Sequence, residues 1–320
     1  MSPSIDAARR GRLTAGIGLL VTTLCWGSTV PITAELLQSV DPLLVAPARY
    51  ALATPILLVF SWIVDRGKPW PRYLPWRRTL YLGASVALFV TLVAFGIYYS
   101  DPITAIAIFA TAPVVALAMS WLADRRRLSN LHLLAVALAV AGGVIAAIYK
   151  PGSALKLGFR GGEFLLLAGI VAWTWYSMKA QAWLAPLGFT QIRLTFVTSL
   201  AALVWLAAFY LAGLGLGLAA PPPASPSAGT ITELVWMAFG PTALGVALWN
   251  YGNAIMGVAV SMLYVNLSPV VSVIISVLLF GADTTAMQML GGLLVVAGVG
   301  LIQIHSLRAS PAPKASAGGA

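Results

Sequence analysis

The chain has 320 residues, of which 60% are hydrophobic and 9% are charged, and it carries a formal net charge of +10. Ordinary globular chains contain about 25% charged residues, so this composition cannot cover a water-exposed surface. It excludes a water-soluble enzyme, a nucleic-acid-binding protein and a disordered chain. It predicts an all-α integral membrane protein whose solvent is mostly lipid.

Ten apolar stretches are long enough to cross a bilayer, whose hydrocarbon core of about 30 Å requires roughly 20 helical residues. They are apolar all round, whereas membrane strands would alternate in polarity over about ten residues. The first is too long for a signal peptide, so we expect it to remain as a helix. The predicted helices cover residues 14–34, 42–64, 79–99, 102–123, 130–149, 163–183, 190–212, 232–254, 258–280 and 286–305.

The distribution of lysine and arginine predicts the orientation of the helices. With a cytoplasmic N-terminus, fifteen of the 19 basic residues fall on the cytoplasmic side and four on the other side. Cytoplasmic loops of membrane proteins carry this excess of positive charge. We therefore expect both termini in the cytoplasm of a cell with a bacterial-type inner membrane. The net charge follows from this topology, and a nucleic-acid partner is not expected.

An internal repeat divides the chain into two five-helix halves. At an offset of 156 residues, Ala112-Pro113-Val114-Val115-Ala116 falls on Ser268-Pro269-Val270-Val271-Ser272, and at an offset of 147 residues Trp26 falls on Trp173. Because five is odd, the second half is expected to enter the membrane inverted relative to the first. Inverted repeats place a binding site near the midplane and allow alternating access, so they favour a transporter. A duplicated membrane scaffold without transport is the alternative.

The repeat also predicts the boundaries of the halves. The linker within the second half carries no charge and is rich in proline, glycine and alanine, which predicts a flexible extracytoplasmic loop. The predicted segments are a first repeat with its N-terminal segment (1–149), an extracytoplasmic connection (150–162), a second repeat (163–305) containing the flexible loop (214–230), and a disordered cytoplasmic tail (306–320).

Several short motifs resemble those of a known family. Trp26-Gly27-Ser28 and Ala48-Arg49-Tyr50 resemble the first two helices of the EamA-type drug/metabolite transporters, and the Pro-Val-Val motifs after Ala112 and Ser268 resemble the fourth and ninth helices. This resemblance implies a ten-helix inner-membrane carrier that moves small metabolites, commonly amino acids, outward. The family often has an acidic pair after the fourth and ninth helices, and the chain departs from that pattern.

The resemblance extends to a possible substrate class. Leu248-Trp249-Asn250-Tyr251-Gly252 resembles a stretch of the aromatic amino-acid exporters. We therefore expect an exporter of amino acids with aromatic or bulky apolar side chains, and keep a carrier of drug-like or purine-type compounds as the alternative. No metal-ligand cluster, nucleophile elbow or phosphate loop is found, and His132 and His305 are far apart in sequence, so we expect no enzyme, no cofactor and no metal.

Polar and aromatic side chains within the spans are the candidates for binding the substrate. An asparagine amide facing lipid would be unsatisfied, so such residues are expected to face protein or a cavity. The alternative for the aromatic residues is an interfacial belt, and for the arginines it is snorkelling or capping of a neighbouring helix. Arg193, the repeat equivalent of Arg49, is a weaker candidate. The predicted substrate-binding residues are Trp26, Arg49, Tyr98, Trp173, Tyr176, Asn250, Asn253 and Tyr264.

Two repeat-equivalent prolines, Pro113 and Pro269, are expected near the middle of their spans. Proline frees a backbone carbonyl and kinks a helix, so the pair predicts a hinge or gate, with a static kink as the alternative. The expected partners are a small-molecule substrate and the lipid bilayer. Small residues on the fifth and tenth helices would also permit a homodimer.

Overall fold

In the computed structural model, the described part of the chain comprises residues 3–99, 108–124, 129–149, 161–268, 270–271, 274 and 285–308, and within these residues it is helical without strands. The first half contains α1 (Pro3–Gly27), α2 (Thr29–Leu36), α3 (Pro42–Val64), α4 (Trp76–Tyr98), α6 (Ala112–Asp124) and α7 (Asn130–Ile148). The second contains α8 (Gly162–Leu184), a 3₁₀ turn (Ala185–Leu187), α9 (Gln191–Gly215), α10 (Ala228–Met237), a π-helical segment (Ala238–Leu244), α11 (Gly245–Met256), α12 (Val258–Val265) and α14 (Ala286–Arg308).

Most helices follow the predicted spans. Four continuous helical stretches, Pro42–Val64, Trp76–Gly96, Gln191–Gly215 and Ala228–Met256, are long and apolar enough to cross a membrane. Helix α1 begins before the first predicted span, because no proline separates its polar N-terminal turns from the apolar run. The predicted connection between the repeats, residues 150–162, lies largely outside the described residues.

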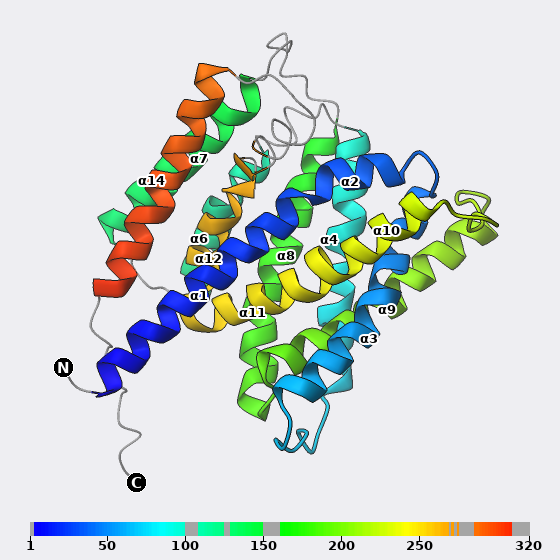
Figure 1. Ribbon diagram of the computed structural model, residues 1–320, viewed down its shortest axis with the longest axis horizontal. Coiled ribbons are helices and arrows are strands. Elements are labelled where there is room, and N and C mark those ends of the chain that lie inside the picture. Colours follow the sequence, from blue (N-terminus) through cyan, green and yellow to red (C-terminus); the bar gives the residue numbers. More distant parts are fainter. Residues whose placement is uncertain are drawn as a thin grey trace.

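The helices pack in pairs that join the two halves. Helix α1 packs on α11, α3 on α9, α4 on α8, α6 on α12 and α7 on α14 (Figure 1). In terms of the predicted spans, these pairs are first with eighth, second with seventh, third with sixth, fourth with ninth, and fifth with tenth. Exchanging the first half for the second reproduces the same set of pairs, so the packing follows the sequence repeat.

Helices α3 and α9 are antiparallel, and their ends are joined in the same way. The N-cap residue Asp41 of α3 accepts a hydrogen bond from the backbone N–H of Ala220, beyond the end of α9, at 2.8 Å. The N-cap residue Thr190 of α9 donates to the Asp65 carboxylate, just beyond the end of α3. Tyr210 also donates to the Ala220 carbonyl at 2.9 Å, so the proline-rich loop is tied to the helices at this point.

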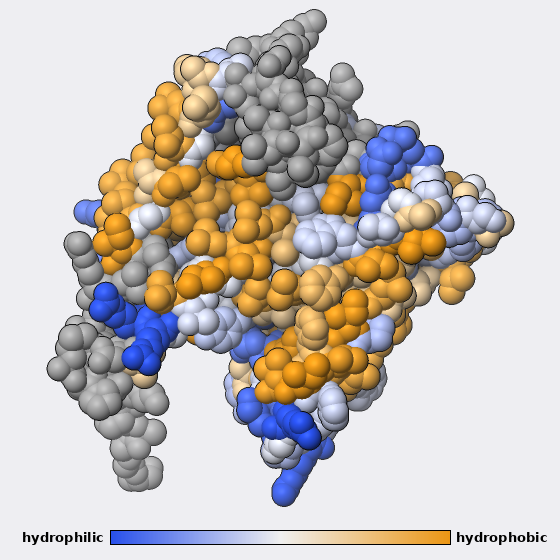
Figure 2. Space-filling view, viewed as in Figure 1, coloured by the Kyte–Doolittle hydropathy of each residue, from blue (hydrophilic) through white to orange (hydrophobic). Residues whose placement is uncertain are grey.

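Large apolar side chains are exposed on the outside of the helices. Phe164, Trp62 and Leu211 are 74%, 69% and 64% exposed, respectively. In Figure 2 apolar residues cover the flanks of the helices, whereas hydrophilic residues gather at their ends. Soluble monomers rarely expose apolar surface on this scale, so these flanks are suited to contact with lipid. The protein is a multi-pass membrane protein.

Glycines allow α7 and α14 to approach closely. A Cβ atom on Gly142 would lie 2.5 Å from the Gly291 carbonyl oxygen, and one on Gly298 would lie 2.7 Å from the Ala135 carbonyl oxygen. Gly142 and Gly298 are equivalent at the offset of 156 residues. The small-residue faces of the fifth and tenth predicted helices therefore pack on each other within one chain. A homodimer through these faces would have to compete with this contact.

This contact predicts a difference between two glycine substitutions. Gly142→Ala should destabilise the protein by about 1–3 kcal/mol, because the new methyl group meets backbone atoms of α14. Gly300→Ala should be neutral or stabilising by up to about 1 kcal/mol, because a Cβ atom there has no neighbour within 4 Å and alanine favours a helix. Thermal unfolding in detergent measures both effects, and equal effects at the two positions would contradict the packing argument.

Candidate functional site

Three tryptophans from both halves lie against one another in the interior of the helix bundle. The ring centroids of Trp26 on α1 and Trp173 on α8 are 5.5 Å apart in an edge-to-face arrangement. Trp249 on α11 lies 5.4 Å from Trp26 and 5.8 Å from Trp173. Non-parallel contacts of this kind are favourable for aromatic pairs. Two repeat-equivalent residues are thus brought together, and Trp249, which the sequence did not single out for the site, joins them.

A buried network of polar groups lies beside the tryptophans. The Asn250 Nδ2 group donates to the Tyr176 hydroxyl at 3.0 Å and to the Thr195 hydroxyl at 2.9 Å. The hydroxyls of Tyr176 and Thr198 are 3.1 Å apart, and either can donate. Trp249 Nε1 donates to the Ser177 hydroxyl at 3.0 Å. These bonds connect α8, α9 and α11, and satisfy polar groups that lipid could not.

Three amide atoms in this region have no hydrogen-bond partner among the described residues. Asn250 Oδ1 and both polar atoms of the Asn253 side chain are buried without a hydrogen bond. The two residues are three positions apart on α11 and therefore lie on neighbouring turns of one face. Buried polar groups are nearly always paired in native proteins, and an unpaired one calls for an explanation such as water or a ligand. Together these groups offer two carbonyl oxygens as acceptors and one NH₂ group with two donor protons.

The π-helical segment creates the polar environment at the other side of Trp26. Pro241 has no N–H, so the Met237 carbonyl loses its usual helical donor. The Thr242 hydroxyl donates to this carbonyl instead, at 2.8 Å. The Pro241 carbonyl accepts a hydrogen bond from Trp26 Nε1 at 3.0 Å. π-Helical segments within α-helices are frequent at functional sites, and here the segment contacts both Trp26 and Arg49.

Arg49 donates to Thr242 and has no acidic partner in the described part of the chain. Its Nε and Nη2 atoms donate to the Thr242 hydroxyl at 3.2 and 3.0 Å. Within the described residues, no carboxylate lies within ion-pair distance of its guanidinium. A cation inside a membrane span is costly without a counter-charge. The remaining guanidinium donors are therefore available to an anionic group.

Tyr264 and Tyr98, the remaining predicted binding residues, belong to α12 and α4. Tyr264 is buried on α12 in the same apolar cluster as Trp173 and Trp249, and its carbonyl accepts a hydrogen bond from the Thr23 hydroxyl at 3.0 Å. Tyr98 is the last residue of α4, and its side chain lies outside the described part of the chain.

In each half, a break in the helix precedes the predicted hinge proline in the sequence. Pro113 is the second residue of α6, where a missing N–H costs no hydrogen bond, and the chain departs from helical geometry at Thr111. The equivalent break in the second half follows Val265, before Pro269, which lies outside the described residues. Asn266 donates to the Ala110 carbonyl at 2.9 Å, joining the two breaks. In the first half, the helix is therefore interrupted before Pro113, and Pro113 itself does not kink a continuous helix.

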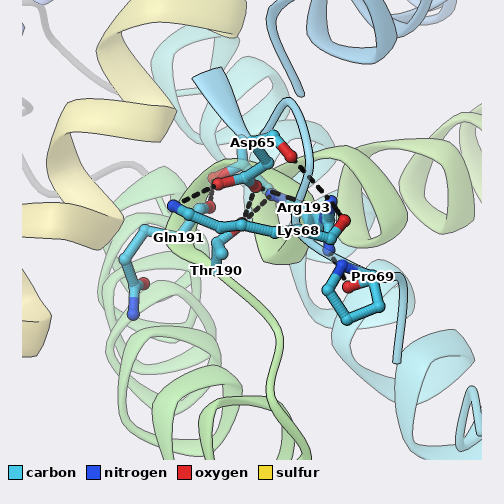
Figure 3. A network of polar contacts seen from close by, with 7 residues as sticks. Asp65, Lys68, Pro69, Thr190, Gln191 and Arg193 are labelled. Atoms are coloured by element: carbon cyan, nitrogen blue, oxygen red, sulfur yellow. Dashed lines mark hydrogen bonds and ion pairs between the residues drawn. The ribbon is translucent and has the colours of Figure 1, made fainter. Parts of the chain in front are cut away.

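A second polar network fixes the connection between α3 and α4 to the start of α9 (Figure 3). The buried Arg193 places Nε 3.2 Å from the Asp65 carboxylate, and donates from Nη1 to the Pro69 carbonyl and from Nη2 to the Lys68 carbonyl. Its guanidinium also lies 4.7 Å from the ring centroid of Trp70. Arg193 thus holds the end of a neighbouring helix, which is the alternative that the sequence left open. Sequence reasoning did not select Asp65.

The environment of Asp65 keeps its carboxylate ionised. Burial raises the pKa of Asp65. Hydrogen bonds from Thr190 and Lys68, together with the positive charges of Lys68 and Arg193, lower the pKa by more than burial raises it, so the pKa lies below its ordinary value. Lys68 Nζ is 2.9 Å from Asp65 Oδ1. The carboxylate therefore remains a fixed negative charge at neutral pH and can hold both cations.

His132 and His305, which are distant in sequence, lie side by side where α7 meets α14, with ring centroids 5.7 Å apart. The Ser129 hydroxyl and His132 Nδ1 are 2.7 Å apart. Among the described residues, no group of three or more His, Cys, Asp or Glu side chains could hold a metal ion. The two imidazoles form an edge-to-face contact between α7 and α14.

Comparison with known proteins identifies relatives along nearly the whole chain. Residues 13–148 and again residues 160–304 match the EamA-like transporter family. Two proteins of Bacillus subtilis (strain 168) are similar: the uncharacterized transporter YrdR is 23% identical, covering 93% of this chain and 94% of its own, and the uncharacterized transporter YyaM is 24% identical, covering 64% and 65%. A crystal structure with 18% identity superposes with a TM-score of 0.75, covering 92% of this chain and 98% of its own, which supports the fold.

The Asp65 network predicts a pH-dependent contribution to stability. Because the pKa of Asp65 is lowered in the folded protein, its contribution is present at neutral pH and is lost as the pH falls below about 4, the ordinary carboxyl value. Asp65→Asn should therefore destabilise the protein at pH 7 by about 1–3 kcal/mol, by leaving Arg193 without its counter-charge.

Thermal unfolding of wild type and Asp65→Asn at several pH values measures this effect, and the difference between them should shrink under acid conditions. Asp41→Asn serves as the matched control, because Asp41 accepts backbone hydrogen bonds but forms no ion pair in the described structure. A difference that stays constant down to low pH would show that the ion pair contributes nothing.

Proposed function

Since the chain belongs to the EamA-like transporter family, we propose that it exports amino acids with aromatic or bulky apolar side chains across a bacterial-type inner membrane by alternating access. The observation that supports this proposal most directly is that Trp26 of the first half contacts Trp173 and Trp249 of the second. The unpaired amide of Asn253 lies beside this cluster. Such an apolar site with a few polar groups is typical of pockets for small molecules.

An inverted ten-helix repeat with cytoplasmic termini is part of the proposal. It is supported by the two family matches in one chain, by the helix pairs that persist when the halves are exchanged, and by the antiparallel course of α3 and α9. In this arrangement the two halves have opposite orientations in the membrane, and exchanging their conformations would open the site to the opposite side. The breaks at Thr111 and after Val265 would then be equivalent points at which the halves bend.

The polar groups favour a solute with both a positive and a negative group. The unpaired oxygens of Asn250 and Asn253 suit an ammonium group, which has three donors. Arg49, without a counter-charge among the described residues, suits a carboxylate. Thr242, which holds Arg49, lies eight residues before Asn250, or about 12 Å along a helix. An amino acid cannot span this distance, so Arg49 would meet the carboxylate at a different stage of transport from the asparagines.

A purine-type substrate is the second candidate. The Asn253 side chain presents an unpaired donor and an unpaired acceptor, and an asparagine amide can pair with both groups on one edge of adenine. The tryptophan faces would stack on such a ring. This substrate has no carboxylate, so its transport would not depend on Arg49.

We predict that Asn253→Leu strongly reduces transport without destabilising the fold. Removing unpaired amide atoms from a buried site should leave the melting temperature unchanged or raise it. Loss of a hydrogen bond to a charged substrate group, worth about 1.5–3 kcal/mol, should reduce exchange about tenfold or more. The measurement is counterflow of each labelled amino acid, and of labelled adenine, in proteoliposomes containing the purified protein.

Ala254→Leu is the matched control, because Ala254 is on the exposed side of the same helix and should retain exchange. Exchange of Trp, Phe or Leu that is lost in Asn253→Leu and in Arg49→Gln would support the amino-acid assignment. Exchange of adenine that survives Arg49→Gln would favour the purine alternative. Unchanged amino-acid exchange in Asn253→Leu would contradict the proposed site.

A further inference from the structure

A small cavity lies outside the central site, where α3 ends and turns toward α4. Its volume is about 220 Å³, which is several times the roughly 30 Å³ that one water molecule occupies in the liquid. Arg66, Lys68 and Arg193 contribute three cations to its wall, against the single carboxylate of Asp65. The wall therefore carries a net positive charge and would attract an anion.

Several donors at this cavity are not used within the described structure. The Ser61 hydroxyl is buried and has no hydrogen-bond partner, and its residue is only 1% exposed. Lys68 uses one of its three ammonium donors on Asp65. The Arg66 guanidinium lies over the Trp62 ring, 5.9 Å from its centroid, and forms no ion pair among the described residues. Arg193, by contrast, forms an ion pair with Asp65 and donates to the carbonyls of Pro69 and Lys68.

The same cavity opens beside the lipid-facing surface of α3. Leu58 and Trp62 line it and are also 47% and 69% exposed. Leu58 and Trp62 are one turn apart on α3, and Arg66, just beyond the end of the helix, lies over the Trp62 ring, so the three form a stripe that runs from apolar to cationic. This stripe lies where the membrane-spanning stretch Pro42–Val64 ends, and tryptophan and arginine are favoured at such an interface.

We propose that this cavity binds the phosphate group of an anionic phospholipid. The phosphate would accept hydrogen bonds from Arg66, Lys68 and Ser61, and an acyl chain would lie along Leu58 and Trp62. Basic pockets at the end of membrane helices bind anionic head groups in this way. An anionic lipid is favoured over a zwitterionic one because the cavity wall already has an excess of cations. The inference depends on membrane insertion and not on the transported substrate.

A bound lipid would also stabilise the present arrangement of α3 and α9. Asp65 and Arg193 form part of the cavity wall and join the end of α3 to the start of α9. A ligand that binds one conformation better than another shifts the population toward it. The lipid would therefore stabilise the conformation in which these helix ends are connected.

The test measures the melting temperature of the purified full chain in neutral detergent with added phosphatidylglycerol. Binding to the folded state alone raises the melting temperature with lipid concentration. We expect phosphatidylglycerol to raise it in wild type, and Arg66→Gln and Ser61→Ala each to lose at least half of this increment, measured against their own lipid-free values.

Arg77→Gln is the matched control, because the Arg77 guanidinium also lies over a tryptophan ring, 5.2 Å from the centroid of Trp76, but does not line the cavity. It should retain the full increment. The proposal is overturned if phosphatidylcholine is as effective as phosphatidylglycerol, if Arg77→Gln loses as much as Arg66→Gln, or if both cavity variants respond like wild type. An equal increment from inorganic phosphate alone would assign the site to a soluble anion and reject the lipid.

Discussion

The hydrocarbon core contains no water, so every polar group within it must find a partner inside the protein. In this molecule, many of those partners belong to the opposite half of the chain. On α1, the hydroxyls of Thr22 and Thr23 donate to the carbonyls of Gly245 and Tyr264, and the indole of Trp26 donates to the carbonyl of Pro241. Apolar surfaces alone would let the halves slide in lipid, whereas these directional bonds specify one arrangement.

Several departures from this rule lie together at the centre, whereas others, such as the Ser61 hydroxyl, lie elsewhere in the described residues. The π-helical segment, the unpaired amides of α11 and the cation Arg49 all lie within or beside the tryptophan cluster. Each is unfavourable in lipid when considered alone. Their presence in one region is expected if a polar solute completes the missing hydrogen bonds during transport.

The repeat made part of this centre predictable. It identified Trp26 and Trp173 as equivalent residues, and the cost of an amide in lipid identified Asn250 and Asn253. Helix rotation was not accessible, so the sequence did not select Trp249 or Thr195. The π-helical segment changes the register around Pro241, which brings Thr242 to Arg49 and could not be anticipated from a regular helix. Asp65 resembled any acidic residue at the end of a span, and only its contacts with Arg193 and Thr190 distinguish it.

The central claim is that the centre is reached from both sides of the membrane in turn. Cys25 is the single cysteine of the chain, so Ser177→Cys, at a position beside Trp249 that is assigned no contact with the solute, gives one defined thiol when combined with Cys25→Ala. Labelling of this thiol by a membrane-impermeant reagent would be measured in right-side-out and inside-out vesicles. The account predicts labelling from both sides, slowed by a transported amino acid. Labelling from one side only, or from neither, would contradict alternating access at this site.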